Sequence, residues 1–347
     1  MDILHVTGKK KESYKIEFTY SILWECALGV AAITNKPLLK SLEKPNTYWL
    51  EMKQSLSNEM LDQLAYVEKN NTWKALLLTL HMENFSSLEQ WEEAVQKLSS
   101  TELRFCCLPY LGSELEQSRK EAAFQKSEAI NQLKEAAAEA DFFPMYIEFI
   151  CNVEARELRE HLIKVMGGWY QMVSARDGKR VLAALQTDVE MKKRVLKKME
   201  PVEFVKWATG GVEYMPEPSV FKVLLIPQYV YRPWNIVADL EATKVLYYPI
   251  ANESLEPNDR LVPDQFLVLK HKALGDEARL KMVKMLAEED LTLHVLTERL
   301  SIGKSTIHHH LKILRAAQLV KKVGSHYRLQ KDSLANLGAE LQVYLNK

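Results

Sequence analysis

The feature that most constrains the fold lies near the end of the 347-residue chain, where three apolar stripes follow one another closely. Each stripe has the spacing of one helix face, which predicts three short helices around a shared core. The stripes consist of Leu280, Val283 and Leu286, then Leu293, Leu296 and Leu300, and finally Ile307, Leu311 and Leu314. Only Ser301, Ile302 and Gly303 separate the second stripe from the third. A three-residue break that buries one apolar side chain is typical of the turn in a helix-turn-helix.

A strand-like segment follows the third stripe directly. Val320 begins the run VKKVGSHYRL, in which Gly324 and Ser325 have the composition of a tight hairpin turn. The flanking residues predict two short strands, over residues 320–323 and 326–329. A hairpin in this place is a wing, so the segment predicts a winged helix-turn-helix domain over residues 266–347.

Residues 272–329 resemble the winged-helix domain of ArsR/SmtB-type bacterial transcription repressors. The matching stretches cover under a quarter of the chain: KALGDEARLKMVKML in the entry helices, LT…L…L in the first helix of the motif, KSTIHHHLKILRAAQLV in the recognition helix, and YRL at the end of the wing. The resemblance implies a homodimer that binds palindromic, double-stranded operator DNA in the cytoplasm. The preceding body is similar, through FTYSILWECALGVAAI and VLLIP…VLYYP, to the large N-terminal domain of a subset of these regulators.

Charge is distributed unevenly, although the chain as a whole holds 46 basic and 46 acidic residues. Residues 266–347 hold 14 Lys and Arg against 8 Asp and Glu, a net charge of +6, so residues 1–265 carry −6. A basic domain attached to an acidic body is typical of a nucleic-acid-binding module. On charge alone, a chance imbalance on a solvated surface is an equal alternative.

Helical geometry divides the predicted recognition helix into two faces. Its apolar stripe points toward the core, so the polar side chains near its N-terminal end point outward, where recognition helices meet base edges. The amides of the first turn also bind phosphates, so Lys304, Ser305 and Thr306 can position the helix as easily as specify a sequence. Cations of the wing are placed to follow phosphates or to enter the minor groove. The predicted DNA-binding residues are Lys304, Ser305, Thr306, His308, His309, Lys312, Lys321, Lys322, His326 and Arg328.

Three consecutive histidines, residues 308–310, invite a metal-binding interpretation, but adjacent helical positions point about 100° apart and do not converge on one ion. We expect His310 at the edge of the core, making a hydrogen bond. Metal-sensing members of the family carry a Cys-x-Cys pair on the first helix of the motif, where this chain has Thr292 and His294. Another family site uses Asp and His on the last helix, and residues 332–347 contain no histidine. The sequence therefore predicts no metal site and no cofactor.

The rest of the chain is predicted to be mostly helical up to about Pro216. Residues 114–140 form a long run of good helix formers, which predicts one solvated helix packed on one face, with a strut or dimer contact as the alternative. Seven of the twelve prolines lie between Pro216 and Pro263, so helices are not expected there. The runs 220–230 and 242–250 predict a small β element, and residues 257–263 a linker.

The predicted fold class is thus mainly α with a small β element. A large helical N-terminal domain, residues 1–262 with a β segment near 219–250, precedes the C-terminal winged helix-turn-helix domain, residues 266–347. No apolar run approaches the roughly 20 residues of a membrane span, and the first residues, MDILHVTGKKKES, lack the apolar core of a signal peptide. Four cysteines without disulfide spacing are expected to be reduced thiols, in agreement with a cytoplasmic protein.

No enzyme is expected, because the chain has no G-x-S-x-G, no Gly-rich phosphate loop and no H-E-x-x-H. The predicted function is a sequence-specific DNA-binding transcriptional regulator, an ArsR-like repressor controlled by a signal, such as a small-molecule effector, that acts on the N-terminal domain. The alternative is a winged helix that serves as a protein-interaction module, with an unrecognised binding or enzymatic activity in the body. Binding that does not rise steeply as salt falls would favour this alternative.

Three features of the chain keep two interpretations each. The apolar C-terminal residues suit a homodimer contact or packing within their own domain equally; they are Leu334, Leu337, Leu341, Val343, Tyr344 and Leu345. The aromatic residues of the β segment favour a core over a ligand pocket; they are Tyr229, Tyr231, Trp234, Tyr247 and Tyr248. Cys106 and Cys107 favour buried thiols over a thiol or arsenite-type sensor.

Overall fold

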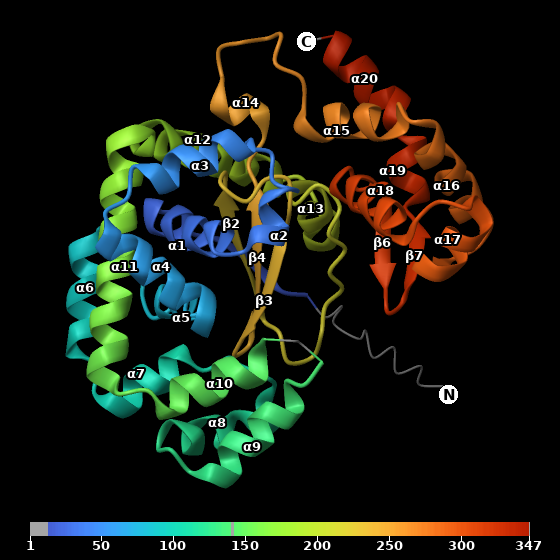
Figure 1. Cartoon of the computed structure of the whole chain (residues 1–347). Coiled ribbons are helices and arrows are strands. Elements are labelled where there is room, and N and C mark those ends of the chain that lie inside the picture. Colours follow the sequence, from blue (N-terminus) through green and yellow to red (C-terminus); the bar gives the residue numbers. More distant parts are fainter. Residues whose placement is uncertain (1–12, 140–141, 347) are drawn as a thin grey trace, which may run out of the picture.

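The computed structural model describes residues 13–139 and 142–346, and it contains a large body followed by a smaller C-terminal domain (Figure 1). Each part has a hydrophobic core of its own. The described residues are mainly helical, with one four-stranded and one three-stranded sheet, which confirms the predicted fold class. The prediction about a signal peptide falls on the first residues, of which 1–12 lie outside the described part. No helix in that part is long and apolar enough to cross a bilayer.

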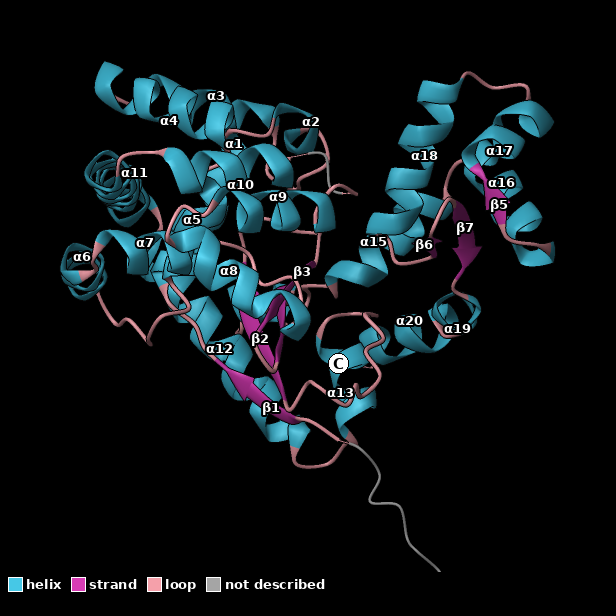
Figure 2. Ribbon diagram, turned by 90° about the horizontal axis from the view of Figure 1, so that it is seen from below, coloured by secondary structure: helices cyan, strands magenta, loops and turns pink. Residues whose placement is uncertain are grey.

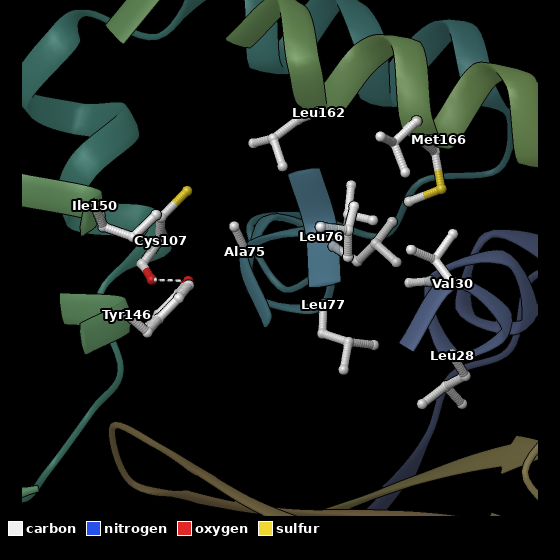
Figure 3. Close-up of a cluster of buried hydrophobic side chains, with 14 of the residues drawn as sticks. Leu28, Val30, Ala75, Leu76, Leu77, Cys107, Tyr146, Ile150, Leu162 and Met166 are labelled. Carbon is white, nitrogen blue, oxygen red and sulfur yellow. Dashed lines mark hydrogen bonds between the residues drawn. The ribbon is translucent and has the colours of Figure 1, made fainter. Parts of the chain in front are cut away.

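Helices of the body wrap around one central helix, α1 (Ile22–Ile33), in which every residue from Leu23 to Ile33 is buried. A helix that is apolar on all sides needs partners on all sides. Figure 3 shows α1 side chains facing Leu76 and Leu77 of one neighbour and Met166 of another. The remaining body helices are α2 (Lys36–Leu39), α3 (Asn46–Gln54), α4 (Asn58–Asn70), α5 (Trp73–Thr79), α6 (Leu88–Lys97), α7 (Ser100–Cys107), α8 (Glu116–Ala123), α9 (Ser127–Ala136), α10 (Phe143–Asn152), α11 (Ala155–Arg176), α12 (Gly178–Leu196), α13 (Pro201–Ala208) and α14 (Asn252–Leu255).

The sheet of the body has the strand order β1-β2-β4-β3. Its strands are β1 (Lys15–Phe18), β2 (Lys222–Gln228), β3 (Ile236–Leu240) and β4 (Thr243–Pro249). The predicted runs 220–230 and 242–250 correspond to β2 and β4, which pair in parallel, while β3 pairs antiparallel with β4. Neither β1 nor β3 was expected from the sequence. Tyr247 and Tyr248 are buried in different clusters on opposite faces of the sheet, so both belong to the core, as the sequence favoured.

The single long helix expected over residues 114–140 is wrong. The chain forms two helices there, α8 and α9, which pack against each other. Between them Gln125 adopts a left-handed conformation, φ 62°, and its Nε2 donates a hydrogen bond to the Cys151 carbonyl at 2.9 Å. The reversal buries small side chains of both helices, such as Ala122 and Ala129, in the body core, which one straight solvated helix does not do.

The C-terminal domain has the expected helices, turn and wing. Its elements are α15 (Gln265–Leu274), α16 (Glu277–Glu288), β5 (Leu291–Thr292), α17 (Leu293–Leu300), α18 (Lys304–Ala316), β6 (Val320–Val323), β7 (His326–Leu329), α19 (Lys331–Ala335) and α20 (Leu337–Leu345). The two wing strands have the predicted bounds, and Gly324 between them has φ 58°. An unexpected third strand, β5, pairs with β7.

One of the predicted core positions is wrong. Leu280 is 49% exposed, and Met282 of the same helix is buried in its place. The stripe of α18 is confirmed, because Ile307, Leu311 and Leu314 are all at most 1% exposed.

Candidate nucleic-acid interface

Helix α18 begins after a tight break in the backbone. Helix α17 ends at Ser301, whose φ of 53° is left-handed, and Gly303 precedes α18 without a side-chain cap. Thr292 caps the start of α17 by accepting a hydrogen bond from the Val295 amide at 3.4 Å. The partly buried Ile302 packs against the core of the domain, so the three-residue break fixes α17 and α18 relative to each other.

The N-terminal end of α18 is open. Lys304, Ser305 and Thr306 are exposed, and among the described residues their side chains make no hydrogen bond or ion pair. His308 and His309, one turn further, are exposed as well. The Thr306 and Ile307 amides donate to the Gly303 carbonyl at 2.9 and 3.1 Å, so this end offers the earlier amides of the first turn together with an ammonium and two hydroxyls. Such a set can bond both phosphate oxygens and base edges.

Lys312 differs from the other predicted residues of α18, because it contacts the body. Its Nζ donates a hydrogen bond to the carbonyl oxygen of Pro37 in α2 at 3.1 Å. Burial, with a smaller contribution from the charge of Arg315, lowers the pKa of Lys312. Arg315 lies over the ring of Trp234, with its guanidinium carbon 5.9 Å from the ring centre. One flank of the recognition helix thus faces the body, as Figure 2 also shows.

The cations of the wing fall into two groups. Lys321 forms an ion pair of 3.1 Å with Glu213 of the body, and Arg328 forms one of 2.6 Å with Asp290 of its own domain. The hydrogen bond to Asp290 raises the pKa of Arg328. Lys322 is exposed and has no such partner among the described residues, and the His326 ring lies 3.2 Å from Ser325 Oγ. All ten predicted residues therefore lie on α18 or the wing, but four of them already have intramolecular partners: Lys312, Lys321, His326 and Arg328.

His310 lies at the edge of the core, where the sequence placed it. Its Nδ1 is 3.4 Å from Nη1 of Arg279, whose Nε donates a hydrogen bond to the Ala273 carbonyl. Burial lowers the pKa of His310, and the charges of Asp276 and Arg279 act in opposite directions. The ring is therefore a neutral acceptor for Arg279 near neutral pH.

The body and the C-terminal domain also meet beside α13. Gln318, directly after α18, donates a hydrogen bond from Nε2 to the Thr209 carbonyl at 3.3 Å. Gly210 has φ 69°, and a Cβ there would lie 2.3 Å from the Phe266 ring. Next to this contact is a cleft of about 1120 Å³ whose walls carry both signs of charge, including Lys206, Asp264 and Glu340. Sequence reasoning missed the whole contact, because no local pattern reports which surfaces of two domains meet.

The residues considered for metal binding and for thiol reactivity lie in less suitable surroundings than the open end of α18. No group of three or more metal-ligating side chains occurs within residues 13–139 and 142–346. Thr292 is committed to its helix cap, and His294 is 79% exposed beside Glu298. Cys107 is buried and Cys106 half-buried, and burial raises the pKa of both thiols. A raised thiol pKa leaves little thiolate, which is the reactive form.

Comparisons with known proteins concern the region that contains α18. Residues 276–322 match the family model described as "Bacterial regulatory protein, arsR family". Over 79 residues, or 22% of this chain, the sequence is 33% identical to "Transcriptional repressor SmtB homolog" from Synechocystis sp., and the aligned segment spans 60% of that relative. No solved structure matches the chain. These matches confirm the resemblance inferred from residues 272–329.

Proposed function

We propose that this chain, which carries a helix-turn-helix of the ArsR/SmtB type near its C-terminus, is a sequence-specific DNA-binding transcriptional regulator and acts as a homodimeric repressor in the cytoplasm. The observation that carries the proposal is the open N-terminal end of α18. The side chains of Lys304, Ser305 and Thr306 have no hydrogen bond or ion pair among the described residues, and the opposite side of the helix is held by a core. A preorganised helix of this kind enters a major groove without reorganising first.

The roles of the ten predicted residues differ under this proposal. Lys304 and Thr306 contact base edges, and Ser305 and the first-turn amides bond phosphate oxygens. Lys322 and His326 reach a neighbouring phosphate strand from the wing, whereas Lys321 and Arg328 exchange a carboxylate partner for a phosphate. An exposed ion pair contributes little free energy, so this exchange costs little.

The homodimer is proposed to form through α20. No residue of this helix is buried, and its apolar side chains remain open, with Leu341 38%, Val343 63% and Leu345 65% exposed. Leu341 and Leu345 lie one turn apart on the same face of α20, and an exposed apolar pair of this kind favours a two-fold contact with a second copy. Such a dimer presents two α18 helices to the two halves of a palindromic site. Leu345→Lys is expected to shift the protein to monomers in sedimentation, and an unchanged dimer would move the contact elsewhere.

The body is proposed to be a regulatory domain rather than an enzyme. Its contacts to Lys312, Lys321 and Gln318 connect it to both the recognition helix and the wing. A signal that changes the body therefore has a physical route to the DNA-binding residues.

Fluorescence anisotropy tests the function directly. The full chain is titrated onto the duplex upstream of its own gene and onto a scrambled duplex, at two salt concentrations. A preference of roughly a thousandfold and a steep salt dependence are expected of a specific regulator. Weak binding to both duplexes, without a salt slope, would contradict the proposal and favour the protein-interaction alternative.

A further inference from the structure

A groove of about 430 Å³ lies between α2 of the body and the recognition helix. Both helices contribute to its walls, although they lie far apart in the sequence, and Figure 2 shows them facing each other. The lining residues are Lys36, Pro37, Lys40, His308, His309 and Lys312. Three lysines and two histidines meet here, and no acidic side chain belongs to the lining.

The positive charge of this groove is poorly neutralised by the protein. Lys40 is exposed, and its side chain makes no ion pair or hydrogen bond among the described residues. Lys36 has one exposed partner, Glu68, at 2.8 Å, and the Nζ of Lys312 meets only the neutral Pro37 carbonyl. Like charges gathered in a groove repel each other unless an anion lies between them. The arrangement is therefore suited to an anionic ligand.

The position of the groove indicates which anion this is. His308 and His309 of its wall are also part of the outward face of α18, next to Ser305 and Thr306. A helix that lies in the major groove has a phosphate backbone along each flank. Helix α2 lies against one flank, at Lys312, while the N-terminal end of α18 stays open. A DNA strand that passes this flank would run between α2 and α18.

We propose that the groove between α2 and α18 binds backbone phosphates of DNA, so that Lys36 and Lys40 extend the DNA-binding surface from the C-terminal domain onto the body. This inference rests on the proposed function. The two lysines add affinity for any duplex but no sequence preference, because phosphate contacts carry no base information. They also fix the orientation of the body on DNA, which ties a change in the body to a change in affinity.

The test uses the full chain and a labelled duplex of random sequence, with anisotropy measured over a range of salt concentrations. Lys40→Ala is expected to lower the slope of log K against log salt by about 0.9 and to weaken binding roughly five- to tenfold at fixed salt. Lys36→Ala acts in the same direction. Lys120→Ala is the matched control, because Lys120 is exposed on α8, at the far end of the body, and its side chain has no ion pair or hydrogen bond within residues 13–139 and 142–346 (Figure 1).

Two outcomes would overturn the inference while the proposed function stands. One is a salt slope that Lys40→Ala leaves unchanged. The other is tighter binding by Lys40→Ala, which would mean that α2 obstructs the recognition helix instead of sharing its ligand. In both cases the wild type still prefers its specific duplex, and Lys304→Ala still loses that preference. A wild type that binds no duplex would overturn both the inference and the proposed function.

Discussion

The two sides of the recognition helix show how differently similar cations are placed. At the open end of α18, Lys304 has no partner among the described residues, whereas Lys312, two turns later, is half-buried and bonded to the body. The wing repeats the contrast, with Lys322 free and Lys321 paired with Glu213. Basic residues of one domain therefore do not form one uniform DNA-binding surface. Some side chains have no partner among the described residues, and others are held by contacts to the body.

The largest expected effect comes from truncating a buried side chain that holds α18 against the core of its domain. Leu311 is 1% exposed in the middle of α18. Leu311→Ala should lower the free energy of unfolding of the C-terminal domain by about 2–5 kcal/mol, because it leaves a cavity under the helix. Leu280→Ala is the control, since a side chain that is 49% exposed should cost far less. Equal losses in urea titrations of the two variants would contradict this assignment of the core.

The open end of α18 is tested by Lys304→Ala and Thr306→Ala. Each is expected to reduce the preference for specific over scrambled DNA by about 1–3 kcal/mol, or roughly five- to 150-fold, because base contacts are lost. Competition binding at constant salt measures this ratio. If affinity for both duplexes falls equally, the residues bind only phosphates.

A second contrast between the two regions lies in their histidines. In the body, burial lowers the pKa of His161 to about 4, and its ring is bonded to Thr72 and Gln63. A folded-state pKa below the unfolded value means that stability is complete above the unfolded pKa and is lost as pH falls. Through His161, the wild type should lose up to about 2 kcal/mol of its free energy of unfolding as pH falls from 7 to 5. The His161→Gln variant should lack this part of the loss.

The control for this prediction is His294→Gln in the C-terminal domain, where the side chain is 79% exposed. Unfolding titrations at several pH values compare each variant with the wild type. Burial raises the pKa of Glu25 to about 7, so this residue lowers the stability as pH rises, in the opposite direction to His161. Subtracting the wild-type curve from each variant's curve cancels this contribution. A His161→Gln protein with the pH dependence of the wild type would rule out the buried, neutral ring.

The smallest expected effect concerns the paired cations. Glu213→Gln removes the carboxylate that holds Lys321 and should strengthen binding to random DNA by no more than a few fold, because exposed ion pairs contribute about 0–1 kcal/mol. Asp290→Asn, which frees Arg328 within its own domain, is the matched comparison. Weaker binding by Glu213→Gln would show that Glu213 orients Lys321 toward DNA rather than competing with DNA for it.

Local patterns predicted most of the C-terminal domain, although they missed β5. The spacing of apolar residues, the three-residue break and Gly324 specify helices, turn and wing within a few neighbouring residues, so the wing strands were predicted to the residue. Leu280 was misplaced because a position on the edge of a stripe faces core or solvent according to its neighbours. In the body, β1 was missed because its four residues pair with a strand 207 positions away, Lys15 with Lys222.

The sequence by itself determined a mainly helical chain, a winged helix-turn-helix near its end, and the set of polar residues on the outward side of α18. These are consequences of periodicity and turn chemistry, which act over short distances along the chain. Only the tertiary structure decided that residues 114–140 reverse at Gln125, that α2 lies beside Lys312, and that Glu213 holds Lys321. Such contacts depend on the complementarity of surfaces that are distant in sequence, and no local pattern contains that information.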